Sequence, residues 1–131
     1  MKLIKINKIS DKNCSLHYFN KLNSFVKNLK RVFFLKAKKN CFRGNHAHKI
    51  CNQYFFSLDD KIEIFIDDGK GQKKIILKPS HILKIKPLNW VKIKLKKNQL
   101  VGVFCDADYS EKEYIRNYDE FKKKIKKQKK K

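Results

Sequence analysis

No stretch of eighteen apolar residues occurs in this chain, and lysines interrupt the N-terminal segment MKLIKINKIS every few residues. A membrane-spanning helix needs about twenty apolar residues, and the core of a signal peptide is an apolar stretch. The sequence therefore predicts neither, and we expect a cytoplasmic protein without a transmembrane segment. With 131 residues, of which 41% are hydrophobic, the chain is long enough for one domain with a core and too short for two.

Cysteine pairs are also missing. The four cysteines, Cys14, Cys41, Cys51 and Cys105, lie far apart and include no C-x-x-C pair. Their spacing gives neither a zinc-ligand pattern nor a persuasive disulfide framework. We expect reduced and mostly buried thiols.

Arginine is scarce in a strongly basic chain. The formal net charge is +22, but only Arg31, Arg43 and Arg116 among the 34 basic residues are arginines. Nucleic-acid-binding proteins rely on arginine for bidentate contacts with bases and phosphates, whereas the lysines here are spread over every segment. This pattern favours a solvated surface, so we expect no specific nucleic-acid partner.

What the sequence does contain is a series of short β-strands. Several of them alternate apolar residues with lysine, as expected of strands with one buried and one solvated face. Turn residues separate them, as in DDGKG at 67–71 and KPLN at 86–89. Such a series predicts an antiparallel sandwich or barrel. The predicted strands span residues 2–6, 31–37, 46–58, 61–67, 73–78, 82–86, 90–96 and 100–107.

The last part of the chain changes to a helical period. Tyr114, Tyr118, Phe121 and Ile125 follow one another at spacings of four, three and four, which is the stripe of an amphipathic helix. Ser110 followed by Glu113 predicts a capping box. We expect a barrel over residues 1–110, a helix over 111–125 packed on the same domain, and a disordered lysine-rich tail over 126–131.

The segment RGNHAHKICNQ contains two histidines separated by one alanine. Side chains at i and i+2 of a strand project from the same face, so His46 and His48 share one environment. A neutral imidazole titrates near physiological pH and suits acid–base catalysis. Two surface histidines on a strand are the alternative interpretation.

The spacing His46-x-His48, four residues, then Gln53 resembles the first motif of the cupins, which are small jelly-roll barrels. The resemblance implies that both imidazoles face the barrel interior. Metal-binding cupins have a glutamate at the position of Gln53 and a further histidine in a second motif, but this sequence has no histidine after His81. Two imidazoles and an amide are a poor ligand set for a transition metal, so we expect no metal and no other cofactor.

Further motifs resemble one cupin family, the dTDP-4-oxo-6-deoxy-glucose 3,4-ketoisomerases. These are KRVFFL, RGNHAHK with Gln53, IDDG, Trp90 after a proline turn, and DYSEKEYIRNYDEF, which together cover about residues 8–125. The resemblance implies an all-β cupin with a C-terminal α-helix. It also implies a homodimer, with N-terminal strands that are often exchanged between subunits. The implied reaction moves a carbonyl from C4 to C3 of a dTDP-linked 4-oxo-6-deoxy sugar, and amination of the product gives 3-amino-3,6-dideoxyhexoses for surface polysaccharides.

The resemblance also suggests the site residues. His46 and His48 are the catalytic candidates, with His48 slightly favoured as the base from its central place in the motif. Arg31 and Arg43 could hold an enediolate or a diphosphate. Lys49 and Gln53 are further substrate-binding candidates, and Trp90 offers an apolar face for a sugar or base, although it could equally be core.

Some positions depart from the family pattern. Phe33 and Phe34 stand where the family commonly has tyrosine, and Val91 follows Trp90 where histidine or arginine is common. Another hydroxyl, such as that of Tyr18 or Tyr54, could substitute. The alternatives are a catalytically silent cupin that binds a nucleotide sugar and, less favoured, a basic nucleic-acid-binding protein.

Overall fold

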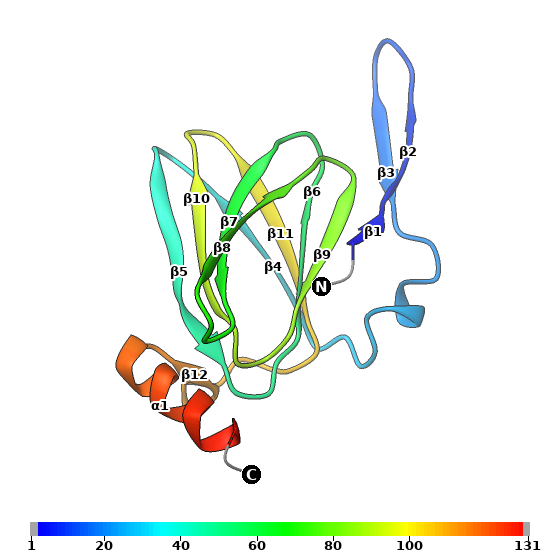
Figure 1. Ribbon diagram of the computed structural model, residues 1–131. Helices are drawn as coiled ribbons and strands as arrows, with labels where there is room; N and C mark the ends of the chain where they lie inside the picture. Colours follow the sequence, from blue (N-terminus) through cyan, green and yellow to red (C-terminus); the bar gives the residue numbers. More distant parts are fainter. Residues whose placement is uncertain (1–2, 130–131) are drawn as a thin grey trace.

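Two antiparallel five-stranded β-sheets packed face to face make up most of the computed structural model, which describes residues 3–129 (Figure 1). One sheet has the order β1-β9-β6-β11-β4: β1 (Leu3–Lys5), β9 (His81–Ile85), β6 (Gln53–Ser57), β11 (Leu100–Cys105) and β4 (Arg31–Lys36). The other has the order β12-β5-β10-β7-β8: β12 (Tyr114–Ile115), β5 (Cys41–His48), β10 (Trp90–Leu95), β7 (Ile62–Asp67) and β8 (Gln72–Leu77). This architecture, completed by α1 (Tyr118–Lys129), confirms the predicted all-β fold with one C-terminal helix.

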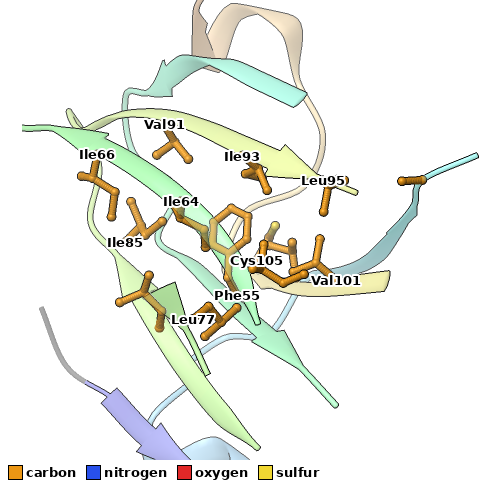
Figure 2. Close-up of a cluster of buried hydrophobic side chains, with 14 of the residues drawn as sticks. Phe55, Ile64, Ile66, Leu77, Ile85, Val91, Ile93, Leu95, Val101 and Cys105 are labelled. Atoms are coloured by element: carbon orange, nitrogen blue, oxygen red, sulfur yellow. The ribbon is translucent and has the colours of Figure 1, made fainter. Parts of the chain in front are cut away.

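The core lies between the two sheets, where alternate residues of each strand meet. On β10, for example, Val91, Ile93 and Leu95 are buried while Lys94 is exposed, as the period-two pattern predicts. Figure 2 shows side chains from both sheets converging around Phe55 of β6. Burial of this apolar surface is the main stabilising contribution to the fold.

The N-terminal segment covers the outer face of the first sheet. It contains the hairpin of β2 (Asn7–Ser10) and β3 (Ser15–Tyr18), which projects from the barrel in Figure 1, and a short 3₁₀ helix at Leu22–Ser24. Ile6, Val26 and Phe19 of this segment pack against Phe56 and Phe104. Strands β6 and β11 are therefore buried on both faces, so they lack the alternation seen elsewhere.

The prediction of one strand over residues 46–58 is wrong. The segment spans two strands, β5 and β6, which belong to different sheets and are joined by residues 49–52. The backbone N–H groups of Ile50 and Cys51 in this connection donate to the Glu113 carboxylate, at 2.9 and 2.8 Å. A carboxylate more than sixty residues away thus holds the chain where it crosses between the sheets.

The predicted helix over 111–125 begins too early. Glu111–Glu113 form a 3₁₀ turn and Tyr114–Ile115 form β12, which pairs with β5. The capping box is wrong, because Ser110 makes no side-chain capping bond and Glu113 is buried elsewhere. Instead Asn117 Oδ1 accepts from the N–H of Glu120 at 3.0 Å at the start of α1.

Helix α1 covers one end of the barrel. Phe121 is fully buried against Trp90, Ile115 and Ile125, and the Tyr118 hydroxyl donates to Asp67. The helix continues to Lys129, so the disordered tail predicted from 126 is wrong for 126–129, and residues 130–131 lie outside the described residues. Within residues 3–129, no helix is long and apolar enough to cross a membrane.

Candidate active site

A β-bulge in β5 determines which of its side chains face the site. Gly44 and Asn45 have φ values of 92° and 57°, and the register with β10 shifts there: Val91 lies opposite His46 and Lys92 opposite Gly44. A Cβ at position 44 would lie 2.8 Å from the Val91 carbonyl oxygen, so a side chain is excluded there. The inserted residue brings Arg43 and His46, which an unbroken strand would direct to opposite faces, to one side of the sheet.

The cavity that results lies between the two sheets and has a volume of about 340 Å³. Strands β4, β5, β6, β10 and β12 line it, with an apolar part and a polar part. The apolar side chains are Phe33, Leu35, Phe42, Phe55, Val91 and Ile93. The polar ones are Arg43, His46, Gln53, Tyr114 and Arg116.

His46 lines this cavity as a neutral imidazole. Burial, followed by the neighbouring His48 ring and by Arg116, lowers the pKa of His46 to about 4. Its Nδ1 is buried and has no hydrogen-bond partner among the described residues. At neutral pH the ring is therefore an available proton acceptor beside the cavity.

His48 lies beside His46 and is bound to a buried carboxylate. The two imidazole rings are 5.0 Å apart and nearly perpendicular, and His48 Nδ1 lies 2.5 Å from Glu113 Oε2. Burial lowers the pKa of His48, although Glu113 opposes this shift. Burial raises the pKa of Glu113, but the bonds from His48, Ile50 and Cys51 outweigh this effect and hold it below its usual value.

These contacts determine the tautomer of His48. Because ionised Glu113 can only accept hydrogen bonds, His48 donates through Nδ1–H, which leaves the lone pair on Nε2. That Nε2 is buried and has no partner among the described residues. The site thus presents a hydrogen-bond acceptor of fixed orientation.

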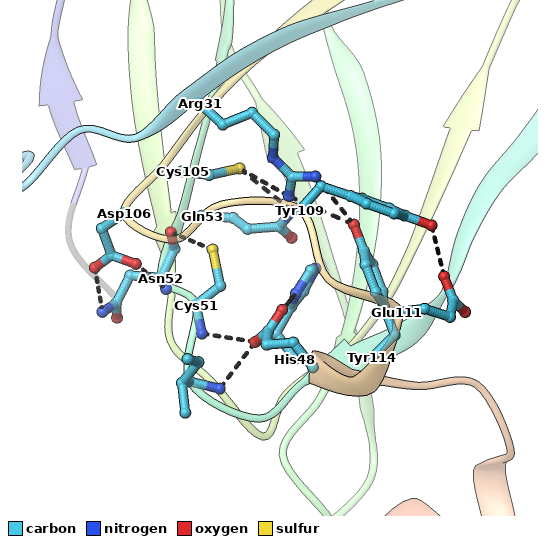
Figure 3. A network of polar contacts seen from close by, with 12 residues as sticks. Arg31, His48, Cys51, Asn52, Gln53, Cys105, Asp106, Tyr109, Glu111 and Tyr114 are labelled. Atoms are coloured by element: carbon cyan, nitrogen blue, oxygen red, sulfur yellow. Dashed lines mark hydrogen bonds and ion pairs between the residues drawn. The ribbon is translucent and has the colours of Figure 1, made fainter.

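A tyrosine and an arginine complete the cluster. The Tyr114 ring lies 4.9 Å from His46 and 4.5 Å from His48, between centroids. Its hydroxyl accepts from Arg31 Nη1 and Nη2 at 3.5 and 3.4 Å, and Arg31 Nη2 also donates to Cys105 Sγ at 3.5 Å. Figure 3 shows Arg31 held between Cys105 and Tyr114.

The structure brings some of the predicted binding residues to the cavity and leaves others away from it. Arg43 and Gln53 line it, and Arg31 reaches it through Tyr114. Lys49 is exposed in the β5–β6 connection and does not line the cavity. Trp90 packs against Tyr118 and Phe121 of α1, which is the core role that the sequence left open.

The two tyrosines considered as substitutes also lie elsewhere. Tyr18 is on the β2–β3 hairpin, and Tyr54 packs in the cluster under the N-terminal segment, with Lys84 over its ring. Glu113, Tyr114 and Arg116 were missed because the helical spacing assigned them to the helix predicted over 111–125, where their side chains had no catalytic role. The motif YIR was visible in the sequence, but its pairing with β5 was not.

The donor set does not suit a transition metal. Among residues 3–129, no group of three or more His, Cys, Asp or Glu side chains is arranged to hold a metal ion. Gln53 is turned toward Cys105, with Nε2 3.9 Å from Sγ. All four cysteines are free thiols; Cys51 and Cys105 are buried and Cys14 is exposed.

Comparison with known proteins identifies the family. The profile of the family described as FdtA, WxcM-like, C-terminal, matches residues 1–126. The TDP-4-oxo-6-deoxy-alpha-D-glucose-3,4-oxoisomerase of Aneurinibacillus thermoaerophilus is 33% identical over 127 residues, which are 95% of this chain and 91% of the relative.

Solved structures agree with this result. The sugar 3,4-ketoisomerase QdtA from Thermoanaerobacterium thermosaccharolyticum, in complex with TDP, superposes with a TM-score of 0.85 at 31% identity, covering 97% of this chain and 95% of QdtA. A 3,4-ketoisomerase from Helicobacter canadensis has a TM-score of 0.84 at 30% identity, with coverages of 95% and 96%. A family profile matching nearly the whole chain and relatives above 30% identity lead to one conclusion: this chain is an isomerase of the FdtA (WxcM-like) family of dTDP-sugar 3,4-ketoisomerases, with the cupin fold.

Proposed function

We propose that this protein converts dTDP-4-oxo-6-deoxy-D-glucose into a dTDP-3-oxo-6-deoxyhexose. The observation that carries the proposal is the neutral His46 beside a cavity of about 340 Å³ in a chain whose relatives carry out 3,4-ketoisomerisation. A variant of QdtA in which a histidine is replaced by asparagine was crystallised with TDP-4-keto-6-deoxyglucose. That structure supports the same sugar as the substrate here.

The reaction requires proton transfer and no net redox change. A base removes the proton from C3, an enediol forms across C3 and C4, and a proton returns to C4. We assign the base to His46 rather than His48, because His46 lines the cavity whereas the Nδ1 of His48 is engaged by Glu113. His48 would accept a hydrogen bond from a sugar hydroxyl through Nε2 and pack against the His46 ring.

The remaining polar residues would hold the substrate. Arg43, an exposed residue of the cavity lining, carries positive charge suited to the diphosphate or to an enediolate, whereas Arg116 beside Tyr114 is already paired with Glu111. Gln53, which is buried and lines the cavity, would bond a sugar hydroxyl. The apolar wall formed by Phe33, Leu35 and Phe55 suits the deoxy face of the sugar.

The function is tested by proton NMR of dTDP-4-oxo-6-deoxyglucose with the purified protein in deuterium oxide. We expect a 3-oxo sugar with deuterium at C4, and the signal at C4 then reports the stereochemistry of the product. If the sugar binds but neither product nor exchange at C3 is seen, the protein is a silent nucleotide-sugar-binding cupin. Absence of binding would show that the substrate is wrong.

The pH dependence tests the identity of the base. The proton acceptor works only when deprotonated, so activity is present above its pKa and is lost as the pH falls through it. Because the pKa of His46 is about 4, kcat/KM is expected to be level from neutral pH down to near pH 5 and to fall below that. Initial rates between pH 4 and 8 measure this, with a stability check at each pH. An acidic limb near 6.5, the ordinary histidine value, would contradict a buried neutral His46 as the base.

The assembly of the protein and the fate of its product are also proposals. We propose a cytoplasmic homodimer whose 3-oxo product is aminated at C3 to a 3-amino-3,6-dideoxyhexose for surface polysaccharide. Ile9 and Leu16 on the projecting hairpin and Val32 and Phe34 on edge strand β4 are exposed, which supports burial against a second copy. In the single chain, β1 pairs with β9, and an exchanged N-terminal strand would make the same pairing between subunits.

A further inference from the structure

We propose that the outward face of α1 holds the protein by charge on membranes that contain anionic lipids. This lysine face consists of Lys123, Lys126 and Lys127. The interaction goes beyond the proposed function and leaves the cavity beside His46 free, because none of the three lysines lines that cavity. The distribution of charge along the chain, the packing of α1 and the surroundings of its lysines support this surface.

Positive charge is concentrated at the end of the chain. The last ten residues contain eight of the 34 basic residues and none of the 12 acidic ones, which makes them the most positive stretch of this length. The acidic residues of α1, Asp119 and Glu120, lie in its first turn. The remainder of the helix therefore carries lysines without any acidic residue among them.

The packing of α1 turns the lysine face to solvent. The helix lies across one end of the barrel (Figure 1), with Phe121 fully buried and Ile125 partly buried against it. At 3.6 residues per turn, positions 123, 126 and 127 lie on the side of the helix opposite Phe121, and all three lysines are exposed. Because the core already uses the apolar side of α1, the helix offers charge to a partner and no apolar anchor.

No acidic side chain neutralises this face. On the barrel, Lys74 and Lys94 both contact Glu63, at 2.7 and 3.7 Å. Among the described residues of α1, by contrast, no lysine forms an ion pair. Lys122 is turned inward, and its Nζ donates to a backbone carbonyl oxygen of the β7–β8 turn at 3.4 Å. The lysine face thus keeps its charge available for an external partner.

An anionic lipid surface fits this face better than a nucleic acid does. Residues 122–129 contain no arginine and no aromatic residue, which are the residue types that read bases or stack on single strands. Lysine is a hydrated point charge on a flexible stem, so its attraction to a layer of negative headgroups needs no fixed geometry. Each lysine close to such a layer strengthens binding about fivefold.

Co-sedimentation with lipid vesicles tests the interaction. The full chain is mixed with vesicles of phosphatidylcholine and phosphatidylglycerol, and separately with vesicles of phosphatidylcholine alone. We expect sedimentation only with the anionic vesicles. It should be present at an ionic strength of about 0.15 M and be lost near 1 M, where the screening length falls from about 8 to about 3 Å. No binding to the anionic vesicles, or equal binding to both kinds, would overturn the proposal.

The combined variant Lys123→Gln, Lys126→Gln and Lys127→Gln locates the contact. Glutamine forms helices about as well as lysine, so α1 is expected to persist. Loss of three charges is expected to weaken binding to the anionic vesicles by about 100-fold, as three factors of about fivefold. The kcat of isomerisation should stay within twofold of wild type. Circular dichroism checks that the variant folds.

Lys38→Gln, Lys39→Gln and Lys97→Gln together are the matched control, since they remove the same charge at the other end of the barrel. Strand β10 runs from Trp90, beside α1, to the end where the turns that carry these lysines meet (Figure 1). We expect vesicle binding within threefold of wild type. If the control weakens binding as much as the α1 variant does, overall charge and not the lysine face carries the interaction.

A single-stranded RNA oligonucleotide is the competing ligand. If the α1 variant loses RNA binding but keeps vesicle binding, the face serves nucleic acid and the membrane proposal fails. The vesicle assay does not involve the sugar. A protein that binds anionic vesicles through α1 but does not isomerise the sugar would therefore contradict the proposed function alone.

Discussion

Replacing His46 by asparagine is expected to lower kcat for 3,4-ketoisomerisation about 1,000-fold, the middle of the range for loss of a positioned general base. Asparagine keeps a polar side chain of similar reach but cannot accept a proton at neutral pH. Exchange of the C3 proton with deuterium oxide should be lost together with product formation, since both depend on the same proton abstraction. Proton NMR of the sugar, followed over hours, measures both.

His17→Asn is the matched control for this variant. His17 lies on the β2–β3 hairpin, 3.8 Å from Asp59, and does not line the cavity. Its replacement should leave kcat unchanged. Binding of TDP by the His46→Asn protein should stay within threefold of wild type, because the change is confined to the base. Full activity of His46→Asn would transfer the role of base to His48.

Glu113→Ala is expected to lower the free energy of unfolding by about 3–5 kcal/mol, because three donors lose their partner and each unsatisfied buried donor costs about 1–3 kcal/mol. Glu113 is only 8% exposed and accepts hydrogen bonds from His48 and from the N–H groups of Ile50 and Cys51. Alanine leaves all three donors without a partner at the point where the chain crosses between the sheets. Urea denaturation followed by circular dichroism measures the loss.

Glu113→Gln separates the structural role of this residue from its effect on His48. The amide oxygen can still accept from Ile50 and Cys51, so we expect a stability loss of only about 1–2 kcal/mol. The amide NH₂ donates to His48 Nδ1, which moves the ring proton to Nε2 and removes the unpaired acceptor beside His46. We expect at least a tenfold loss of kcat and a changed nitrogen chemical shift of His48. If Glu113→Gln has wild-type kcat, the tautomer of His48 does not matter to the reaction.

The stabilising effect of Glu113 also depends on pH. Its pKa in the folded protein lies below its ordinary value of 4.5, so the ionised form stabilises the fold above that pH. The contribution is lost as the pH falls through the folded pKa. Glu113→Gln has no such group, so its stability should fall less steeply on acidification than that of wild type.

The sequence by itself was sufficient to predict the fold class, because the alternation of apolar and polar residues that indicates a strand is a local feature. The alternation of lysine with Val91, Ile93 and Leu95 is local and survives in the structure. The pairing of His46 and His48 on one face follows from the two-residue period of a strand, and it also survives. Motifs such as RGNHAHK and YIRNYD were enough to indicate the family, which the comparisons confirm.

Other features depend on contacts between distant residues, and only the tertiary structure decided them. Glu113 meets His48 across 65 positions of sequence, and Tyr114 meets Arg31 across 83. The helical spacing of Tyr114, Tyr118 and Phe121 predicted one helix. In the structure Tyr114 belongs to β12, which pairs with β5, and the helix begins only at Tyr118. A bulge at Gly44 brings Arg43 to the face of His46, against the period-two rule. Local periodicity thus determined which residues share a face, whereas long-range hydrogen bonds and burial decided which of them form the site.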